Sequence, residues 1–319
     1  MRYHSAIYGL RIHLNERVPG LKFSTLNSGT PDLQIDFGAL PAWFENKRLT
    51  RELRYVRPNS EPSAKPRLAV WSVGDHYHLQ YLDGTEFLVD GGGTRVWATW
   101  PADTLTLEDT ATYLLGPIMG FVLLLRGFVS LHACAVAIND RAIAIVGPAG
   151  SGKSTTAAAF AELGYAILAE DVVTLRDRGD EFLVQPGYPS IRLWPSSVEA
   201  LYGSAATLPK LTPTWDKCYL DLTQEKYEFQ QQPLPLGGIY LLGERSDQAA
   251  PSISEIAPAE RLMSLVANTY ATYLMDKTMR AREFEILNRI LNSVPVKRVT
   301  PHSDPRRIGE LCETIIKDV

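Results

Sequence analysis

The chain has little cysteine and no excess of positive charge, and each shortage excludes a class of protein. Only three cysteines occur in 319 residues, Cys134, Cys218 and Cys312, and they lie far apart with no C-x-x-C pair. They offer neither a disulfide framework nor a zinc site, and they fit a reducing cytosol. The formal net charge is -4 and the basic residues are scattered, so the sequence lacks the electrostatic footprint of a nucleic-acid-binding protein.

The sequence also lacks a long uninterrupted apolar run. Its most apolar stretch, 113–125, contains Pro117 and two glycines and stops at Arg126. It is therefore well short of the roughly 18 apolar residues that a membrane span needs. The first residues, Met1 to Tyr8, have no apolar core of the signal-peptide type. We expect a cytoplasmic protein with no membrane partner.

The pattern of apolar and turn residues predicts an α/β protein in two parts. Residues 1–105 contain strand-like segments at 68–73, 77–82 and 85–89 with glycine-containing turns between them. They predict a smaller α+β or mostly β N-terminal module. In 106–319 we expect helices over 107–125, 155–163, 258–275, 278–291 and after Asp304, strands at 128–138, 142–146, 165–169, 172–175, 181–184, 219–222 and 238–242, and an irregular segment over 187–213.

A glycine-rich loop lies between the apolar strand 142–146 and the helix 155–163. It follows the pattern G-x-x-x-x-G-K-[ST], and with the next residue it comprises Gly147, Pro148, Ala149, Gly150, Ser151, Gly152, Lys153, Ser154 and Thr155. Glycines let consecutive backbone N–H groups turn toward phosphates, and the helix N-terminus adds the positive end of a dipole. Lys153 is expected to reach the β- and γ-phosphates and the Ser154 hydroxyl to bind Mg²⁺. The alternative is a glycine-rich turn that happens to precede a helix.

Two acidic residues, Glu170 and Asp171, end the next predicted strand. Ligands of α/β sheets sit at the carboxyl ends of strands, so we expect both acids beside Lys153 and Ser154. One carboxylate can hold Mg²⁺ with Ser154, and the other can take the proton from an attacking hydroxyl. The alternative is a strand terminus at which two acids are simply solvated.

The predicted loop strand is entered through a hairpin formed by 128–138 and 142–146. In Ras-like and dinucleotide-binding folds that strand is entered from a helix, so the hairpin indicates a different fold. His132 lies on the strand that pairs with the loop strand. A buried histidine with satisfied hydrogen bonds is the usual reading of such a residue, and a catalytic histidine is the other.

Taken together, the segments Ser130–Ala133, Gly147–Ser154 and Leu163–Val172 resemble the core of the HPr kinase/phosphorylase-like family. The resemblance implies a P-loop core of the HPr kinase/PEP carboxykinase type, a mixed sheet with flanking helices. It also implies that Lys153 and the loop bind ATP and that Ser154 and Asp171 hold Mg²⁺. Glu170 would be the base toward an acceptor serine, and His132 would lie near the transferred phosphate.

The rest of the chain resembles a stand-alone branch of HPr-kinase-related proteins, which includes kinases of lasso-peptide precursors. Three features depart from the family pattern: Glu170 replaces the usual aspartate, Ala149 replaces a usual serine, and the C-terminal signature segment of the bifunctional enzymes has no counterpart. The last departure argues against dephosphorylation and against HPr as the substrate. Arg192 matches an Ile-Arg of the family; it and Lys217 are candidates to clamp phosphate, with solvent-exposed cations as the alternative.

These observations favour an ATP- and Mg²⁺-dependent kinase that phosphorylates a serine of a peptide or protein. A non-catalytic ATP-binding sensor or scaffold stays open, favoured by Glu170, as does a kinase of a small-molecule acceptor. A GTPase is disfavoured because the sequence has no N/T-K-x-D motif. Residues 1–105 are a candidate for recognising the acceptor. Relatives oligomerise, so a homo-oligomer is a further expectation of the resemblance.

Overall fold

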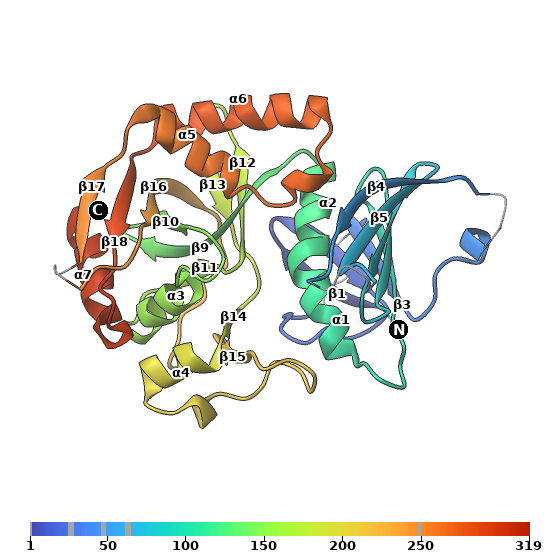
Figure 1. Ribbon diagram of the computed structural model, residues 1–319, viewed down its shortest axis with the longest axis horizontal. Coiled ribbons are helices and arrows are strands. Elements are labelled where there is room, and N and C mark those ends of the chain that lie inside the picture. Colours follow the sequence, from blue (N-terminus) through green and yellow to red (C-terminus); the bar gives the residue numbers. More distant parts are fainter. Residues whose placement is uncertain (1, 25–28, 46–48, 61–64, 248–250) are drawn as a thin grey trace. The chain divides into compact units, whose positions relative to one another are not determined.

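The computed structural model describes residues 2–24, 29–45, 49–60, 65–247 and 251–319 (Figure 1). The chain forms two compact units, Met1–Gly127 with Ala271–Asp276, and Phe128–Tyr270 with Lys277–Val319. Both combine helices with β-strands, and within the described residues each unit is built on a mixed eight-stranded sheet. The protein is therefore of the mixed α/β class.

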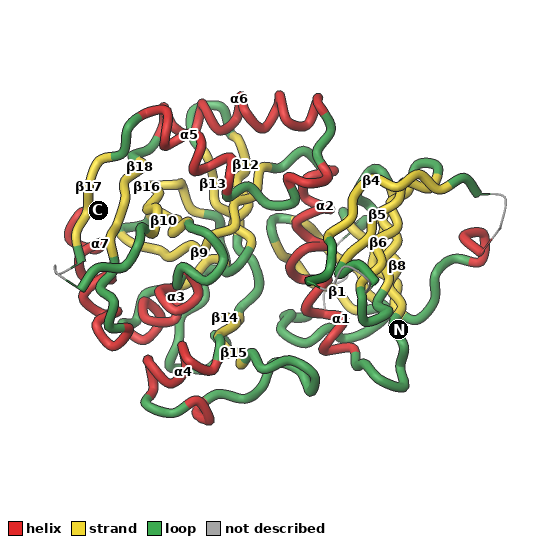
Figure 2. Tube along the Cα trace, viewed as in Figure 1, coloured by secondary structure: helices red, strands yellow, loops and turns green. Residues whose placement is uncertain are grey.

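The first unit is built on a sheet whose strands are drawn in yellow in Figure 2. The strand order is β1-β2-β3-β8-β7-β6-β5-β4. Its strands are β1 (Tyr3–Ile7), β2 (Leu10–Leu14), β3 (Leu33–Phe37), β4 (Arg51–Arg57), β5 (Leu68–Val73), β6 (His76–Tyr81), β7 (Glu86–Asp90) and β8 (Arg95–Thr99), with a 3-10 turn at Ala42–Glu45. The strands expected at 68–73, 77–82 and 85–89 are confirmed to within a residue. In β2 and β3 every second side chain is buried, which is the signature of a strand with one face on a core.

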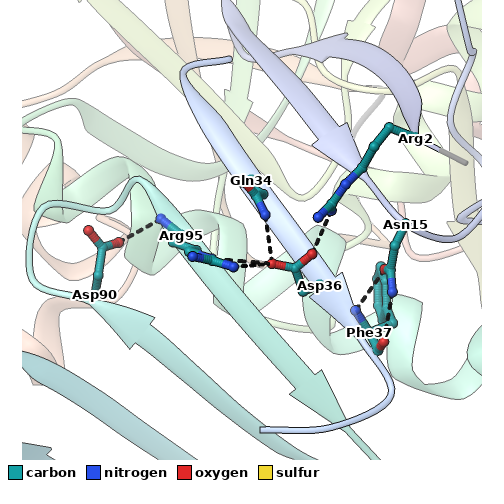
Figure 3. A network of polar contacts seen from close by, with 7 residues as sticks. All are labelled: Arg2, Asn15, Gln34, Asp36, Phe37, Asp90 and Arg95. Atoms are coloured by element: carbon teal, nitrogen blue, oxygen red, sulfur yellow. Dashed lines mark hydrogen bonds and ion pairs between the residues drawn. The ribbon is translucent and has the colours of Figure 1, made fainter. Parts of the chain in front are cut away.

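A polar network around Asp36 joins β3 to its neighbours (Figure 3). The Asp36 carboxylate accepts hydrogen bonds from Arg2 at 2.5 Å, from Gln34 at 2.8 Å and from Arg95 of β8 at 3.0 Å. Burial alone would raise the pKa of Asp36, but these hydrogen bonds outweigh it and lower that pKa. The Asp36 carboxylate thus stays charged and links β3 to Arg2 and to Arg95 of β8.

One long helical segment belongs to this first unit. It consists of α1 (Leu107–Tyr113), a π-helical turn (Leu114–Ile118) and α2 (Met119–Leu125). Pro117 has no N–H to donate, and the wider turn accommodates it. Of the described helices this one alone is long and apolar enough to cross a membrane, and 78% of its apolar window is buried inside the structure, as in a core helix.

The helical segment also shifts the boundary between the units. The Tyr113 ring stacks on Tyr81 of β6 at 4.0 Å, and Phe121 meets Tyr77 edge-on at 5.0 Å. The segment therefore packs on the first sheet, and the units divide after Gly127, whereas the sequence-based boundary lay between 105 and 106.

The second unit contains the other mixed sheet, in which β10-β9-β12-β13-β16-β18-β17 are neighbours. Its strands are β9 (Val129–Ile138), β10 (Arg141–Val146), β11 (Ile167–Ala169), β12 (Val172–Asp177), β13 (Phe182–Gln185), β16 (Leu234–Leu242), β17 (Ser252–Glu255) and β18 (Val296–Thr300). β10 pairs antiparallel with β9 and parallel with β16. The expected hairpin before the glycine-rich loop is thus present, and the sheet is mixed as expected.

Successive side chains along the strands of this sheet point to its two opposite faces, and helices cover both faces. Cys134, Val136, Ile143 and Ile145 pack with α3 (Lys153–Glu162) and α7 (Ile308–Asp318). The intervening positions of β9 and β10 pack with α5 (Pro258–Ala267) and α6 (Lys277–Ser293) on the other side. The second unit therefore has a three-layer architecture around the loop strand.

Two sequence-based expectations for this unit are wrong. The segment 187–213 is not irregular: it holds β14 (Ser190–Leu193), α4 (Pro195–Tyr202) and a 3-10 turn at Ala205–Thr207, and β14 pairs with β15 (Cys218–Asp221). The helix expected over 258–275 ends at Ala267. There the chain joins β9 instead: the Asn268 carbonyl accepts the His132 N–H, and the Tyr270 N–H donates to the Ser130 carbonyl, both at 2.7 Å.

Candidate active site

The glycine-rich loop, residues 147–154, joins β10 to the start of α3. Gly150 and Gly152 have φ angles of 82° and 108°, in the left-handed region that favours glycine. A Cβ on Gly147 would lie 2.8 Å from the Ser151 Oγ. α3 has no side-chain N-cap, so its first N–H groups are left for an anion. The strand, the loop and the helix therefore form a backbone cradle at the start of α3.

Lys153 lies at the centre of this cradle and is buried. Its Nζ donates to the carbonyls of Gly147 at 2.7 Å and Pro148 at 3.0 Å. Burial lowers the pKa of Lys153, and the nearby acids Glu170 and Asp171 partly oppose this. Burial also raises the pKa of the neighbouring Cys134 thiol to about 12, so this thiol is neutral and the two acids are the relevant counter-charges.

Glu170 lies next to Ser154, whose hydroxyl donates to Glu170 Oε1 at 2.6 Å. Only 6% of Glu170 is exposed. Its second oxygen, Oε2, is buried and has no hydrogen-bond partner in the described part of the chain. Burial, and then the charge of Asp171, raise the pKa of Glu170. A buried carboxylate oxygen without a partner is costly, and a cation or a proton would satisfy it.

Asp171 is held by other partners. Its Oδ1 lies 3.1 Å from His132 Nδ1, and its Oδ2 accepts the Tyr270 hydroxyl at 3.1 Å. Burial would raise the pKa of Asp171, but the hydrogen bond from His132 and the charges of His132, Arg192 and Lys217 lower it to about 2. Asp171 is therefore a carboxylate at neutral pH.

A backbone turn explains how two successive acids reach the same site. In a regular strand, neighbouring side chains point to opposite faces. Asp171 has a φ of 69°, and the Val172 N–H bonds the Glu170 carbonyl at 2.9 Å, which makes a γ-turn between β11 and β12. Such a conformation costs about 1–3 kcal/mol and is common at functional sites. Glu170 and Asp171 thus lie at a turn between two successive strands, β11 and β12, rather than at the end of the strand sequence.

Two cations approach the acids from the β14–β15 ribbon. Arg192 on β14 is 8% exposed and lies over the Tyr188 ring at 5.4 Å. Lys217, just before β15, lies over the Trp194 ring at 5.1 Å. Both positive charges lower the pKa of Glu170 and of Asp171. Arg192 is thus a buried cation of the site rather than a solvent-exposed one.

The structure brings together His132, Lys153, Ser154, Glu170, Asp171 and Arg192. The Thr155 hydroxyl is used elsewhere, in a 2.9 Å contact with Ser197 of α4. Sequence reasoning missed Tyr270, whose place depends on the pairing of 268–270 with β9. It also missed Arg245, whose guanidinium lies 3.4 Å from the position of a Cβ on Gly152. Neither residue belongs to a recognisable motif.

An open cleft of about 510 Å³ borders the glycine-rich loop. Gly147 and Pro148 line one side, Ser264 and Asn268 of the α5 region line another, and Arg298 of β18 also contributes. Asn268 is the residue whose carbonyl binds the His132 N–H. The cleft therefore extends from the glycine-rich loop to the backbone beside His132.

Comparisons with known proteins give only a distant likeness. No protein-family model matches the chain, and no curated protein matches it. Among solved structures the chain is similar to the HPr(Ser) kinase/phosphatase from Coxiella burnetii, with 11% identity and a TM-score of 0.31 over 59% of this chain and 95% of that chain. A likeness at this level carries no functional argument, so the functional conclusion depends on the site itself.

Proposed function

We propose that this protein is an ATP- and Mg²⁺-dependent kinase that transfers the γ-phosphoryl group to a serine hydroxyl of a peptide or protein. The observation that carries the proposal is one constellation: Lys153 and Ser154 of the glycine-rich loop, beside the buried Glu170 and the partly buried Asp171. The resemblance of the surrounding segments to HPr-kinase-like proteins supports the same reaction class.

The donor set fits a magnesium ion. Mg²⁺ takes hard oxygen ligands and is commonly held by one or two carboxylates together with substrate phosphates. The site offers the Ser154 hydroxyl and the carboxylates of Glu170 and Asp171, and the buried Glu170 Oε2 lacks a partner in the described chain. When bound, the ion would neutralise charge on the β- and γ-phosphates.

The surrounding cations suit phosphoryl transfer. In this reaction negative charge spreads over the oxygens of the transferred group, and catalysis is mostly positioning and electrostatic stabilisation. Lys153, Arg192 and Lys217 all act electrostatically on the same pair of acids, which supports a site in which positive charge would flank a transferred phosphate.

For the acceptor, we propose that its serine reaches His132 and the acids from the 510 Å³ cleft beside the loop. The first unit carries no comparable constellation in its described residues, and we assign it the recognition of the acceptor. The three cysteines are free and buried, in keeping with the proposed cytoplasmic location. A homo-oligomer remains part of the proposal on the resemblance alone.

Transfer from γ-labelled ATP to a panel of serine peptides in the presence of Mg²⁺ tests the proposal. We expect label on serine, and at least about a thousandfold loss in Lys153→Ala, because its charge acts on the transferred group. Lys317→Ala is the matched control, since its side chain is 76% exposed on α7. Bound but unconsumed ATP with every acceptor would instead indicate a sensor, and absence of ATP binding would contradict the proposal entirely.

A further inference from the structure

The sheet of the first unit ends in a strand that has a partner on only one of its edges. β4 (Arg51–Arg57) is last in the strand order and pairs antiparallel with β5. It has seven residues, more than any other strand of this sheet. Among the described residues no strand pairs with its other edge. The backbone N–H and C=O groups along such an edge are a template for one more strand.

β4 buries almost none of its side chains. Six of its seven residues are exposed, and Tyr55 is half-buried. Leu53 and Val56 are 55% and 40% exposed. A β-bulge follows Leu53, which lies opposite Trp71 of β5, whereas Val56 lies opposite Ala69. Because Trp71 and Ala69 are two residues apart on β5, the bulge places both exposed apolar side chains of β4 on the same face of the sheet.

β4 is also basic in a chain that is acidic overall. It carries three arginines against one glutamate, a net charge of +2, whereas the whole chain carries -4. Arg51 lies over the Phe44 ring at 4.6 Å and Arg57 over the Tyr273 ring at 5.6 Å. The one ion pair of β4 within the described part of the chain joins Arg54 to the strand's own glutamate, and both side chains are exposed. The two rings therefore hold guanidinium groups in place without neutralising them.

These features decide which partner fits the free edge of β4. Charges and bulges also protect an edge against pairing, but protection does not require the exposed apolar pair Leu53 and Val56. An antiparallel pair of two β4 strands centred on Arg54 would set Arg51 against Arg57, and like charges across a pair are destabilising. A peptide with acidic and apolar side chains would neutralise the arginines and cover the apolar pair.

We propose that β4 binds an extended, acidic segment of the acceptor by strand addition to the sheet of the first unit. In such complexes backbone hydrogen bonds along the edge give affinity, and contacts of the side chains give specificity. Acidic side chains of the segment pair with Arg51, Arg54 and Arg57, and apolar ones pack on Leu53 and Val56. That the segment belongs to the acceptor rests on the proposed kinase function, whereas its binding to β4 does not.

Fluorescence anisotropy with labelled seven-residue peptides tests the proposal on the full chain without nucleotide. The probe alternates glutamate with valine and threonine, and a comparison peptide has lysine in place of each glutamate. We expect the glutamate peptide to bind at least about tenfold more tightly, because only its charges complement β4. The same peptide N-methylated at alternate residues should lose at least about tenfold in affinity, because it cannot complete the backbone hydrogen bonds.

Charge variants and hydrogen exchange locate the binding on the chain. Arg54→Glu should weaken binding of the glutamate peptide at least about tenfold, since an attraction becomes a repulsion, while Arg54→Lys should bind within about threefold of the unaltered protein. Arg176→Glu is the matched control, because Arg176 is an exposed arginine on β12 of the second unit. The peptide should slow hydrogen exchange of backbone N–H groups in 51–57. Circular dichroism checks that each variant is folded.

The outcomes distinguish this inference from the proposed function. The inference is wrong if the glutamate peptide does not bind up to about 1 mM, binds no better than the lysine peptide, or leaves exchange in 51–57 unchanged. It is also wrong if a single-stranded oligonucleotide binds more tightly, or if protection of 51–57 follows protein concentration instead of peptide concentration. Each of these results leaves the kinase proposal intact. Peptide binding at β4 in a protein that neither binds ATP nor transfers phosphate would support the strand addition and contradict the proposed function alone.

Discussion

Replacing the two neighbouring acids by their amides is expected to change the stability of the second unit in opposite directions. The Asp171 carboxylate is stabilised in the folded protein, since its pKa falls from the ordinary 3.8 to about 2. Each pKa unit is worth about 1.4 kcal/mol, so Asp171→Asn should cost about 2 kcal/mol at neutral pH. For a unit of this size that is a decrease in Tm of about 4–8 °C.

Glu170→Gln should have the opposite sign. Burial raises the pKa of Glu170 above the ordinary 4.5, so the folded state holds an unfavourable charge once the pH exceeds that raised value. A glutamine removes this charge, and its amide oxygen can still accept the Ser154 hydroxyl. We therefore expect Glu170→Gln to be more stable than the unaltered protein at pH 8.

The pH dependence of the two variants' stability follows from the opposite pKa shifts of Glu170 and Asp171. As the pH falls through the raised pKa of Glu170, the unaltered protein takes up a proton and the advantage of Glu170→Gln disappears. The deficit of Asp171→Asn should be smallest above the raised pKa of Glu170, because there the substitution also removes the repulsion between the two carboxylates, and it is lost as the pH falls from about 3.8 toward 2. Thermal unfolding followed by circular dichroism measures the stability of both variants at each pH. Equal destabilisation by the two amides at pH 8 would refute this electrostatic reasoning.

Two further predictions concern the proposed phosphate-binding loop and the cations beside it. Gly152→Ala should weaken nucleotide binding at least about tenfold in calorimetry, because Gly152 has a φ of 108° and Arg245 lies close to it. Gly164→Ala is the control: its φ of 85° at the end of α3 brings a comparable backbone penalty with no expected effect on binding. Lys217→Met should lower kcat about tenfold and leave Tm nearly unchanged, since this lysine is only partly buried; a parental kcat would remove Lys217 from the site.

Much of the site could be predicted because its elements are local in sequence. The glycine pattern fixes a loop between an apolar strand and a helix, and the acids follow on the next strand along the chain. The γ-turn at Asp171 could not be read in the same way, because a positive φ at a non-glycine residue depends on the surrounding structure. The assignment of each acid to its partner is therefore a result of the fold.

Tyr270 shows what local patterns miss. The residues after Ala267 continue a helix-compatible sequence, yet the chain leaves the helix because 268–270 pair with β9. Tertiary pairing outweighs a weak helical preference, and only the folded chain places the tyrosine hydroxyl on Asp171. In contrast, the alternation in β2 and β3 is visible in the sequence, and these strands could have been predicted from it.

The most direct test of the central claim is a crystal structure with Mn²⁺ and the imido analogue of ATP, in which anomalous scattering locates the ion. We expect the triphosphate to be wrapped by residues 147–154 and the ion to lie at Ser154 beside Glu170 and Asp171. An ion bound away from these residues, or a nucleotide bound away from the loop, would contradict the proposed function.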